Sequence, residues 1–162
     1  MLFGNAECGG QQKNRRSGTE NTALVLTAAF ALERMEANRE GTSEKVKRLR
    51  VRALEALQAM GVPYVLLSPE TAVPHIFTFM LPSLRGQVVQ TGLSAAAFDV
   101  GIGSACSSSR EKGDPALLAL GLSPEESRHV IRISLSDRQT PETIAALFTA
   151  LATLLRQYGS AS

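Results

Sequence analysis

The sequence predicts an α/β fold of the α+β type, in which two N-terminal helices precede a small mixed or antiparallel sheet covered by helices. Three observations lead to this prediction. Apolar residues recur at helical spacing from about residue 21 to residue 60, short stretches of strand length follow, and the chain closes with an amphipathic helix. With 162 residues, of which 44% are apolar, the chain suits one globular domain or one domain with an appendage.

The first part of the chain is expected to be irregular and then helical. Residues 1–22 show no sustained period, whereas from about residue 21 to residue 40 apolar residues return at helical spacing, and Gly41 is expected to end this helix. A second helix is expected to begin at Thr42 or Ser43, where a hydroxyl can cap free amides, and to end before Gly61. Its apolar face consists of Val46, Leu49, Ala53, Leu57 and Met60.

The periodicity changes after the second helix. Residues 62–67 and 76–81 are predicted strands, separated by turn-forming residues. A helix is expected over residues 87–98, although Gly92 weakens it. Residues 114–120 indicate a short helix, and the Ser-Pro-Glu-Glu sequence that starts at Ser123 combines a cap, a proline at the first helical position and a capping box.

The last predicted strand carries a candidate binding residue, and a helix follows it. Residues 130–135 alternate, so that Ile131, Ile133 and Leu135 share one face and Arg132 lies on the other. An arginine on a rigid strand suits bidentate recognition of a carboxylate, although a surface charge or an ordinary salt bridge is the commoner outcome. The closing helix begins at residues 140–142 and is expected to pack on the sheet through Ile144, Leu147, Leu151, Leu154 and Leu155.

Residues 101–109, Gly-Ile-Gly-Ser-Ala-Cys-Ser-Ser-Ser, present the thiol of Cys106 within a run of small residues. These neighbours leave the backbone free to bend and the sulfur open to approach, and Arg110 and Lys112 would favour the thiolate. A buried structural cysteine normally has bulky apolar neighbours. Cys106 is therefore a candidate reactive thiol, but small-residue loops also contain inert cysteines, so both interpretations remain open.

Composition excludes several classes of partner. The formal net charge of +2 is small, and no dense Lys/Arg block is interleaved with aromatic residues, so we expect no nucleic acid partner. No apolar run reaches the length of a membrane span and the N-terminus lacks a signal-peptide pattern, so we expect a cytoplasmic protein without a membrane partner. Cys8 and Cys106 match no zinc spacing, and we expect no structural metal.

Three separated stretches resemble one family. They are Gly-Gly-Gln-Gln (9–12) with Arg-Ser-Gly-Thr-Glu-Asn (16–21), Gly-Ser-Ala-Cys-Ser-Ser (103–108), and Leu-Gly-Leu-Ser (120–123) with Ile-Arg-Ile-Ser-Leu (131–135). In this order the chain resembles the C-terminal portion of the cysteine desulfurases, class-V aminotransferases of fold-type I that depend on pyridoxal phosphate (PLP). The resemblance implies that residues 61–162 form the small C-terminal α/β domain of such an enzyme. Residues 1–60 would be the tail of its large PLP-binding domain plus connecting helices.

The resemblance also implies roles for single residues. In this family PLP activates free L-cysteine, a loop thiolate attacks the substrate sulfur, L-alanine leaves, and the enzyme keeps a persulfide. Cys106 would be this nucleophile, Arg132 would hold the carboxylate of L-cysteine, and Thr19 would contact the cofactor phosphate in the partner subunit of a homodimer. A sulfur-acceptor protein is implied as well, for iron–sulfur cluster assembly or for thiolated nucleotides.

The chain also departs from the family pattern. The family's cofactor lysine belongs to a Ser-x-His-Lys segment upstream of the Arg-Ser-Gly-Thr motif, and no lysine here follows a histidine. Gln12 replaces a usual glutamate, and together these departures suggest a truncated enzyme. We therefore expect no covalently bound PLP and no desulfuration by the chain alone. Other hypotheses are a stand-alone persulfide carrier, a purely structural homologue, and a relative of selenocysteine lyase.

Overall fold

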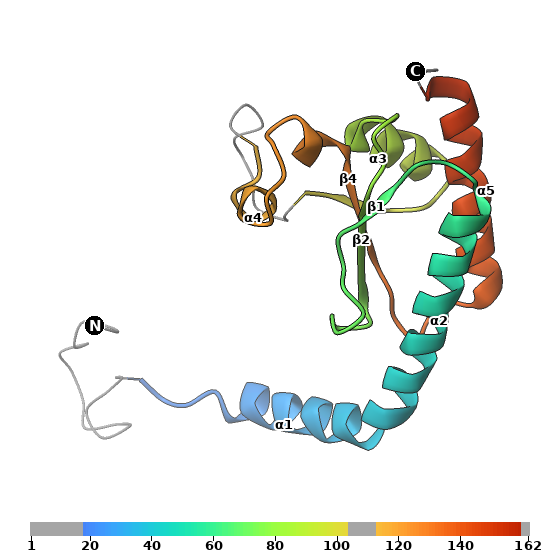
Figure 1. Ribbon diagram of the computed structural model, residues 1–162. Helices are drawn as coiled ribbons and strands as arrows, with labels where there is room; N and C mark the ends of the chain where they lie inside the picture. Colours follow the sequence, from blue (N-terminus) through green and yellow to red (C-terminus); the bar gives the residue numbers. More distant parts are fainter. Residues whose placement is uncertain (1–17, 104–112, 160–162) are drawn as a thin grey trace. The chain divides into compact units, whose positions relative to one another are not determined.

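The computed structural model describes residues 18–103 and 113–159 (Figure 1). The chain divides into two compact units, Met1–Glu40 and Gly41–Ser162. Within its described residues the first unit contains helix α1, Thr22–Ala37. The second contains most of helix α2, Arg39–Ala59, together with a four-stranded sheet and the remaining helices. This mixed architecture confirms the predicted fold class, whereas the assignment of residues 1–60 to a larger domain stays a prediction.

The first helix is confirmed, but the boundary between the two N-terminal helices differs from expectation. Asn21 caps α1 by accepting a hydrogen bond from the backbone N–H of Leu24 (3.0 Å). Helix α2 begins at Arg39 and runs through Gly41, because a glycine inside a helix costs only about 1 kcal/mol and the buried face of α2 offsets it. The expected cap, Thr42, donates its hydroxyl to the Asp137 carboxylate instead (3.3 Å).

The sheet is antiparallel, with the strand order β1-β2-β4-β3. Its strands are β1 (Val65–Leu66), β2 (Ile76–Met80), β3 (Gly101–Ile102) and β4 (Val130–Ser134). Three of them lie within the predicted strand regions. Strand β3 was not predicted, because two residues in a glycine-rich stretch have no strand period, and it forms only by pairing Gly101 with Arg132 and Ile102 with Ile131.

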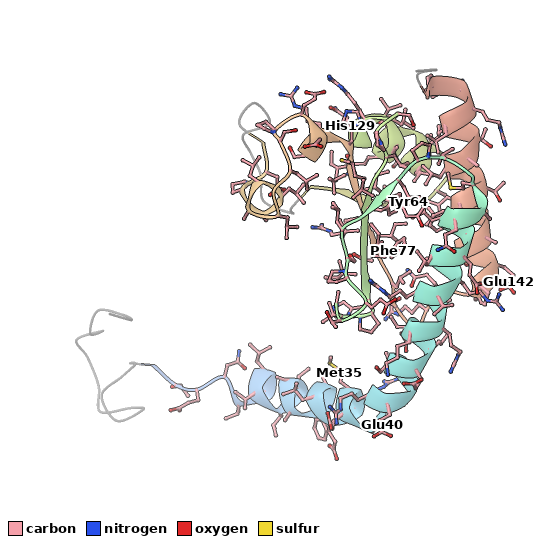
Figure 2. The ribbon with its side chains drawn as sticks, viewed as in Figure 1. Met35, Glu40, Tyr64, Phe77, His129 and Glu142 are labelled. Atoms are coloured by element: carbon pink, nitrogen blue, oxygen red, sulfur yellow. The ribbon has the colours of Figure 1, made fainter. Side chains whose placement is uncertain are left out.

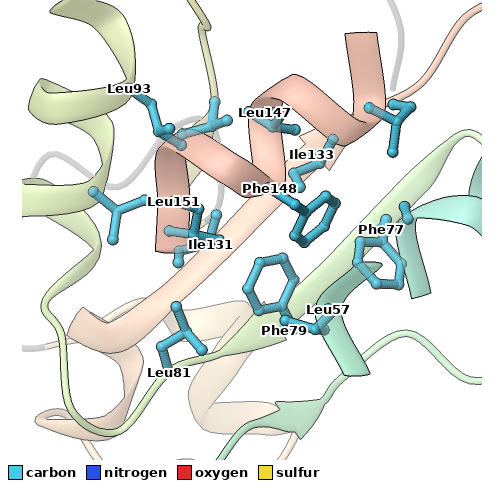
Figure 3. Packing of buried hydrophobic residues seen from close by; sticks show 14 of the residues in the cluster. Leu57, Phe77, Phe79, Leu81, Leu93, Ile131, Ile133, Leu147, Phe148 and Leu151 are labelled. Atoms are coloured by element: carbon cyan, nitrogen blue, oxygen red, sulfur yellow. The ribbon is translucent and has the colours of Figure 1, made fainter. Parts of the chain in front are cut away.

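The hydrophobic core lies between one face of the sheet and helices α2, α3 (Gly86–Ala95) and α5 (Pro141–Tyr158), as Figure 3 shows. The ring of Phe79 is fully buried, 5.4 Å from that of Phe77 and 6.4 Å from that of Phe148, measured between centroids. The apolar faces predicted for α2 and α5 are confirmed by the buried residues Val46, Leu49, Ala53, Leu57, Ile144, Leu147, Leu151 and Leu155. Periodicity thus identified the packing faces correctly.

Packing against α5 explains the glycine at position 92 within helix α3. A Cβ atom at this position would lie 2.5 Å from Cδ2 of Leu154 on α5, which is closer than van der Waals contact allows. The glycine therefore lets the two helices approach each other. A residue that weakens α3 locally serves the tertiary packing.

Arg50 joins α2 to the loop between β1 and β2. Its guanidinium donates to the carbonyl oxygens of Ile76 (2.6 Å) and Ser68 (3.1 Å), and lies 5.5 Å from the ring centroid of Phe77. Phe77 is labelled in Figure 2. Charge-assisted hydrogen bonds and a cation–π contact therefore hold this loop on the helix.

Replacement of Ala97 by glycine is expected to stabilise the protein. Ala97 follows α3 with a φ of 64°, and the N–H of Phe98 donates to the carbonyl of Leu93, as in a Schellman motif. Because a side chain is strained at positive φ, Ala97→Gly should raise the free energy of unfolding by about 1 kcal/mol in urea titrations. Ala95→Gly, inside the helix, should lower it by a similar amount. A loss of stability in both variants would contradict this explanation.

The predicted capping box is confirmed and precedes β4. The N–H of Ser123 donates to the Glu126 carboxylate (2.8 Å), and the N–H of Glu126 donates to the Ser123 hydroxyl (3.2 Å). The element that follows is one turn of 3₁₀ helix, η2, Glu126–His129. The capping box therefore orients the chain just before it enters β4.

Glu126 is expected to contribute to acid sensitivity. Hydrogen bonds from the backbone and side chain of Ser123 lower the pKa of Glu126 in the folded protein. Its contribution is therefore fully present above the ordinary glutamate pKa of about 4.3 and is lost as the pH falls through the lower pKa of the folded state. Denaturation between about pH 5 and about pH 3 should show a smaller loss of stability in Glu126→Gln than in the parent. Equal losses would exclude a role for this hydrogen-bonded carboxylate.

Candidate functional site

Arg132 lies on the face of β4 that is turned away from the hydrophobic core, as predicted. The alternation of the strand buries Ile131 and Ile133 and places the half-buried Arg132 between Thr78 on β2 and Gly101 on β3. Antiparallel pairing on both sides fixes the backbone of Arg132. The arginine therefore projects from a rigid, central strand.

Gly101 provides the space in which the guanidinium of Arg132 lies. A Cβ atom at Gly101 would be 2.9 Å from Nη2 and 3.1 Å from Nε of Arg132. Nη1 donates a hydrogen bond to the carbonyl oxygen of Gly103 (3.2 Å). The absence of a side chain at Gly101 and this carbonyl together determine where the guanidinium lies.

The remaining hydrogen-bond capacity of Arg132 suits an anionic group. A guanidinium carries five N–H donors, and the contact with Gly103 uses one of them. Across residues 18–103 and 113–159, no carboxylate lies within ion-pair distance of Arg132. A planar guanidinium of this kind can bind a carboxylate through two parallel hydrogen bonds.

Cys106, the predicted nucleophile, lies outside the described residues. In the sequence Cys106 is three residues after Gly103, whose carbonyl oxygen accepts a hydrogen bond from Arg132. The role of Cys106 stays a prediction.

Gly103 and Asp114, which come before and after Cys106 in the sequence, lie close to each other. Gly103 has a φ of 61°, and a Cβ atom there would be 2.8 Å from Oδ2 of Asp114. Asp114 is the N-cap of helix α4, Pro115–Ala119. The sequence identified Gly101 and Gly103 only as small neighbours of Cys106, although the Gly-x-Gly spacing was also a signal of close backbone approach, and it gave no sign of Asp114.

Thr19 lies in the first unit, on an exposed segment that precedes α1. The neighbouring Gly18 has a φ of 97°, a conformation that favours glycine. A hydroxyl beside such a glycine can hydrogen-bond a phosphate. Thr19 and Arg132 belong to different compact units, so the predicted role of Thr19 stays a prediction.

The described residues do not by themselves form a PLP site. Of the lysines, Lys45 donates to the carbonyl of Asp137, and Lys47 pairs with Glu44 at 2.6 Å on the exposed side of α2. Neither lysine is placed for a Schiff base with the cofactor. Within residues 18–103 and 113–159 there is also no group of three His, Cys, Asp or Glu side chains that could hold a metal ion.

A helix able to cross a bilayer is not found among the described residues. Surface hollows of the described residues include one along α3 and the Asp99 loop and one between the start of α3 and His129. Arg132 lines neither of these. The candidate site is therefore defined by the guanidinium of Arg132 and the adjoining strand β3.

Comparisons with known proteins were made for sequence and for structure. The aminotransferase class-V family matches residues 2–147. The cysteine desulfurase IscS of Clostridium botulinum strain Hall is 28% identical over 152 residues, covering 92% of this chain and 38% of the relative. Cysteine desulfurase IscS 1 of Archaeoglobus fulgidus is 27% identical, covering 95% of this chain and 40% of the relative. The chain thus spans about two fifths of the length of these relatives.

Solved structures agree with this similarity. A NifS-like protein from Rickettsia africae superposes with a TM-score of 0.76 at 26% identity, covering 92% of this chain and 39% of that protein. Another NifS-like protein superposes with a TM-score of 0.75 at 24% identity, covering 93% of this chain and 38% of that one. The described fold therefore corresponds to part of a NifS-like fold.

Proposed function

Because the chain belongs to the class-V aminotransferase family, we propose that it is part of a cysteine desulfurase that converts L-cysteine to L-alanine and holds the sulfur as a persulfide on Cys106. Arg132 carries the proposal. Arg132 lies on a central strand, and its guanidinium has no carboxylate partner among the described residues. The guanidinium also donates a hydrogen bond to the carbonyl oxygen of Gly103, which precedes Cys106 by three residues.

In the proposed reaction Arg132 binds the carboxylate of L-cysteine through two parallel hydrogen bonds. This contact orients the substrate so that its sulfur faces the Cys106 thiolate. Cys106 acts as the nucleophile, since the thiolate is the reactive form of cysteine.

The rest of the proposal comes from the family resemblance. Residues 61–162 would form the small domain, and residues 1–60 the tail of the large domain with connecting helices. Thr19 would contact the PLP phosphate across a cytoplasmic homodimer, and a sulfur-acceptor protein would receive the persulfide. The described lysines do not fit the Schiff base, so the chain's own contribution is the thiol and the carboxylate-binding arginine.

The proposal predicts that a carboxylate-bearing reagent reaches Cys106 preferentially. In a Cys8→Ser background, rates of alkylation by iodoacetate and by its neutral analogue iodoacetamide are measured on the purified chain. Both reagents attack the same thiolate, so changes in the pKa of Cys106 cancel in their ratio. Arg132→Gln should lower the iodoacetate/iodoacetamide ratio about fivefold, the factor for one ion pair at about 4 Å in water.

Arg156→Gln is the matched control, because it removes the same charge from the exposed side of α5, the helix that packs on the other face of the sheet. It should leave the ratio unchanged. If Arg132→Gln also leaves the ratio unchanged, the substrate-carboxylate role is wrong. A stand-alone persulfide carrier, which needs a thiol but no carboxylate site, would then be the better hypothesis.

A further inference from the structure

Helix α1 exposes large apolar side chains on opposite sides. Within the described part of the chain none of its residues is buried, and six large apolar side chains are between 58% and 69% exposed: Leu24, Val25, Leu26, Phe30, Leu32 and Met35. A helix that is apolar on all sides is normally covered by other elements, and most helical stability in proteins comes from packing of an apolar face. Helix α1 therefore needs a partner.

One face of α1 has the spacing of a helix that pairs with another helix. Residues at intervals of four, three and four positions repeat the core spacing of a coiled coil: Leu24, Ala28, Ala31 and Met35. Val25 and Leu32 flank this row on the same side of the helix. We call these six residues the α1 stripe, to which the labelled Met35 of Figure 2 belongs.

The charged residues of α1 lie outside the α1 stripe. The helical period places Glu33 behind the stripe, and Arg34 and Glu36 at its margins. Glu36 is already paired with the exposed Arg39 (3.2 Å). Two copies of the chain can thus place stripe against stripe without burying a charge, which would be costly. A surface that matches itself in this way is what a two-fold symmetric dimer requires.

The area of the α1 stripe predicts a weak association. The large side chains of two stripes would together remove roughly 500 Å² of apolar surface from water. Stable interfaces between proteins usually bury more than about 1,000 Å² in total. Pairing through α1 alone should therefore depend on protein concentration.

We propose that the α1 stripe is a self-association surface, on which a second copy of the chain lays its own α1. This inference rests on the homodimer of the proposed function, for which it names the contact surface. Thr19, the residue proposed to act across that homodimer, precedes the start of α1 by three residues. Pairing through α1 would bring the segment of Thr19 to the second copy, and it involves neither Cys106 nor Arg132.

Sedimentation equilibrium of the purified chain tests this proposal, with a thiol reductant present so that disulfides between copies do not contribute. The average mass should rise from that of one chain toward that of two as the concentration is raised about a hundredfold. Leu24→Lys and Met35→Lys each place a charge in the α1 stripe. Each should weaken the association constant about tenfold or more, because an unpaired charge is costly at a packed contact.

Leu26→Lys and Phe30→Lys are the matched controls, because they add the same charge on the opposite side of α1, at residues that are also well exposed. They should leave the association unchanged, and thermal unfolding identifies any variant that fails to fold. A parent chain that stays monomeric, or equal weakening by substitutions on both sides of α1, would overturn the inference. If Arg132→Gln still lowers the iodoacetate/iodoacetamide ratio in a monomeric parent, the self-association is wrong and the carboxylate-binding role stands.

Discussion

Serine in place of Cys106 is expected to abolish sulfur uptake by the chain. When the chain is incubated with an active cysteine desulfurase and L-cysteine, the Cys106 thiolate should attack the outer sulfur of the donor persulfide. A new S–S bond then forms on Cys106 while the donor thiolate leaves, so no external oxidant is consumed. A serine hydroxyl is not ionised at neutral pH and cannot replace the thiolate. Intact-mass measurement should show one added sulfur atom on the parent and none on Cys106→Ser.

Cys8→Ser is the internal control for this experiment, because it removes the chain's other thiol and leaves Cys106 in place. This variant should gain the sulfur atom as the parent does, and a thiol reductant should remove it. Sulfur that remains on Cys106→Ser, or that disappears in Cys8→Ser, would assign the uptake to Cys8. The persulfide role of Cys106 would then be wrong.

Alanine in place of Phe79 is expected to have the largest effect on stability. Phe79 is fully buried between β2 and the helices, next to the rings of Phe77 and Phe148. Loss of the ring removes apolar burial and leaves a cavity, which together should lower the free energy of unfolding by about 3 to 5 kcal/mol. Equilibrium denaturation in urea measures this change directly.

Leu120→Ala is a suitable control for Phe79→Ala, since Leu120 is also apolar but 66% exposed. Its replacement should change stability by less than about 0.5 kcal/mol. A loss below about 1 kcal/mol in Phe79→Ala would mean that the aromatic cluster does not form the centre of the core.

The sequence by itself determined the features that depend on local spacing. The buried faces of α2 and α5 follow the helical period, the alternation of residues 130–135 placed Arg132 on the face away from the core, and the capping box at Ser123 forms as expected. Each of these patterns involves residues within a few positions of one another. Local geometry alone therefore sufficed to predict them.

Helix boundaries were less predictable, because several weak local preferences compete there. Thr42 is a good N-cap residue by type, yet it lies inside α2 and contacts Asp137, far away in the sequence. The partner that decided this outcome comes from a distant segment. Phe148, in contrast, lies on the same helical face of α5 as Ile144 and Leu151 and is buried there against Phe79.

The tertiary structure alone decided the arrangement around Arg132. Strand β3 is two residues long and exists through pairing with β4, which brings Gly101 beneath the guanidinium and Gly103 to its Nη1. Asp114, the N-cap of α4, lies close to Gly103 although the two residues belong to different elements. Spacing in the sequence could identify the arginine and the thiol as separate candidates. Long-range strand pairing, which no local period encodes, determined which residues surround the arginine.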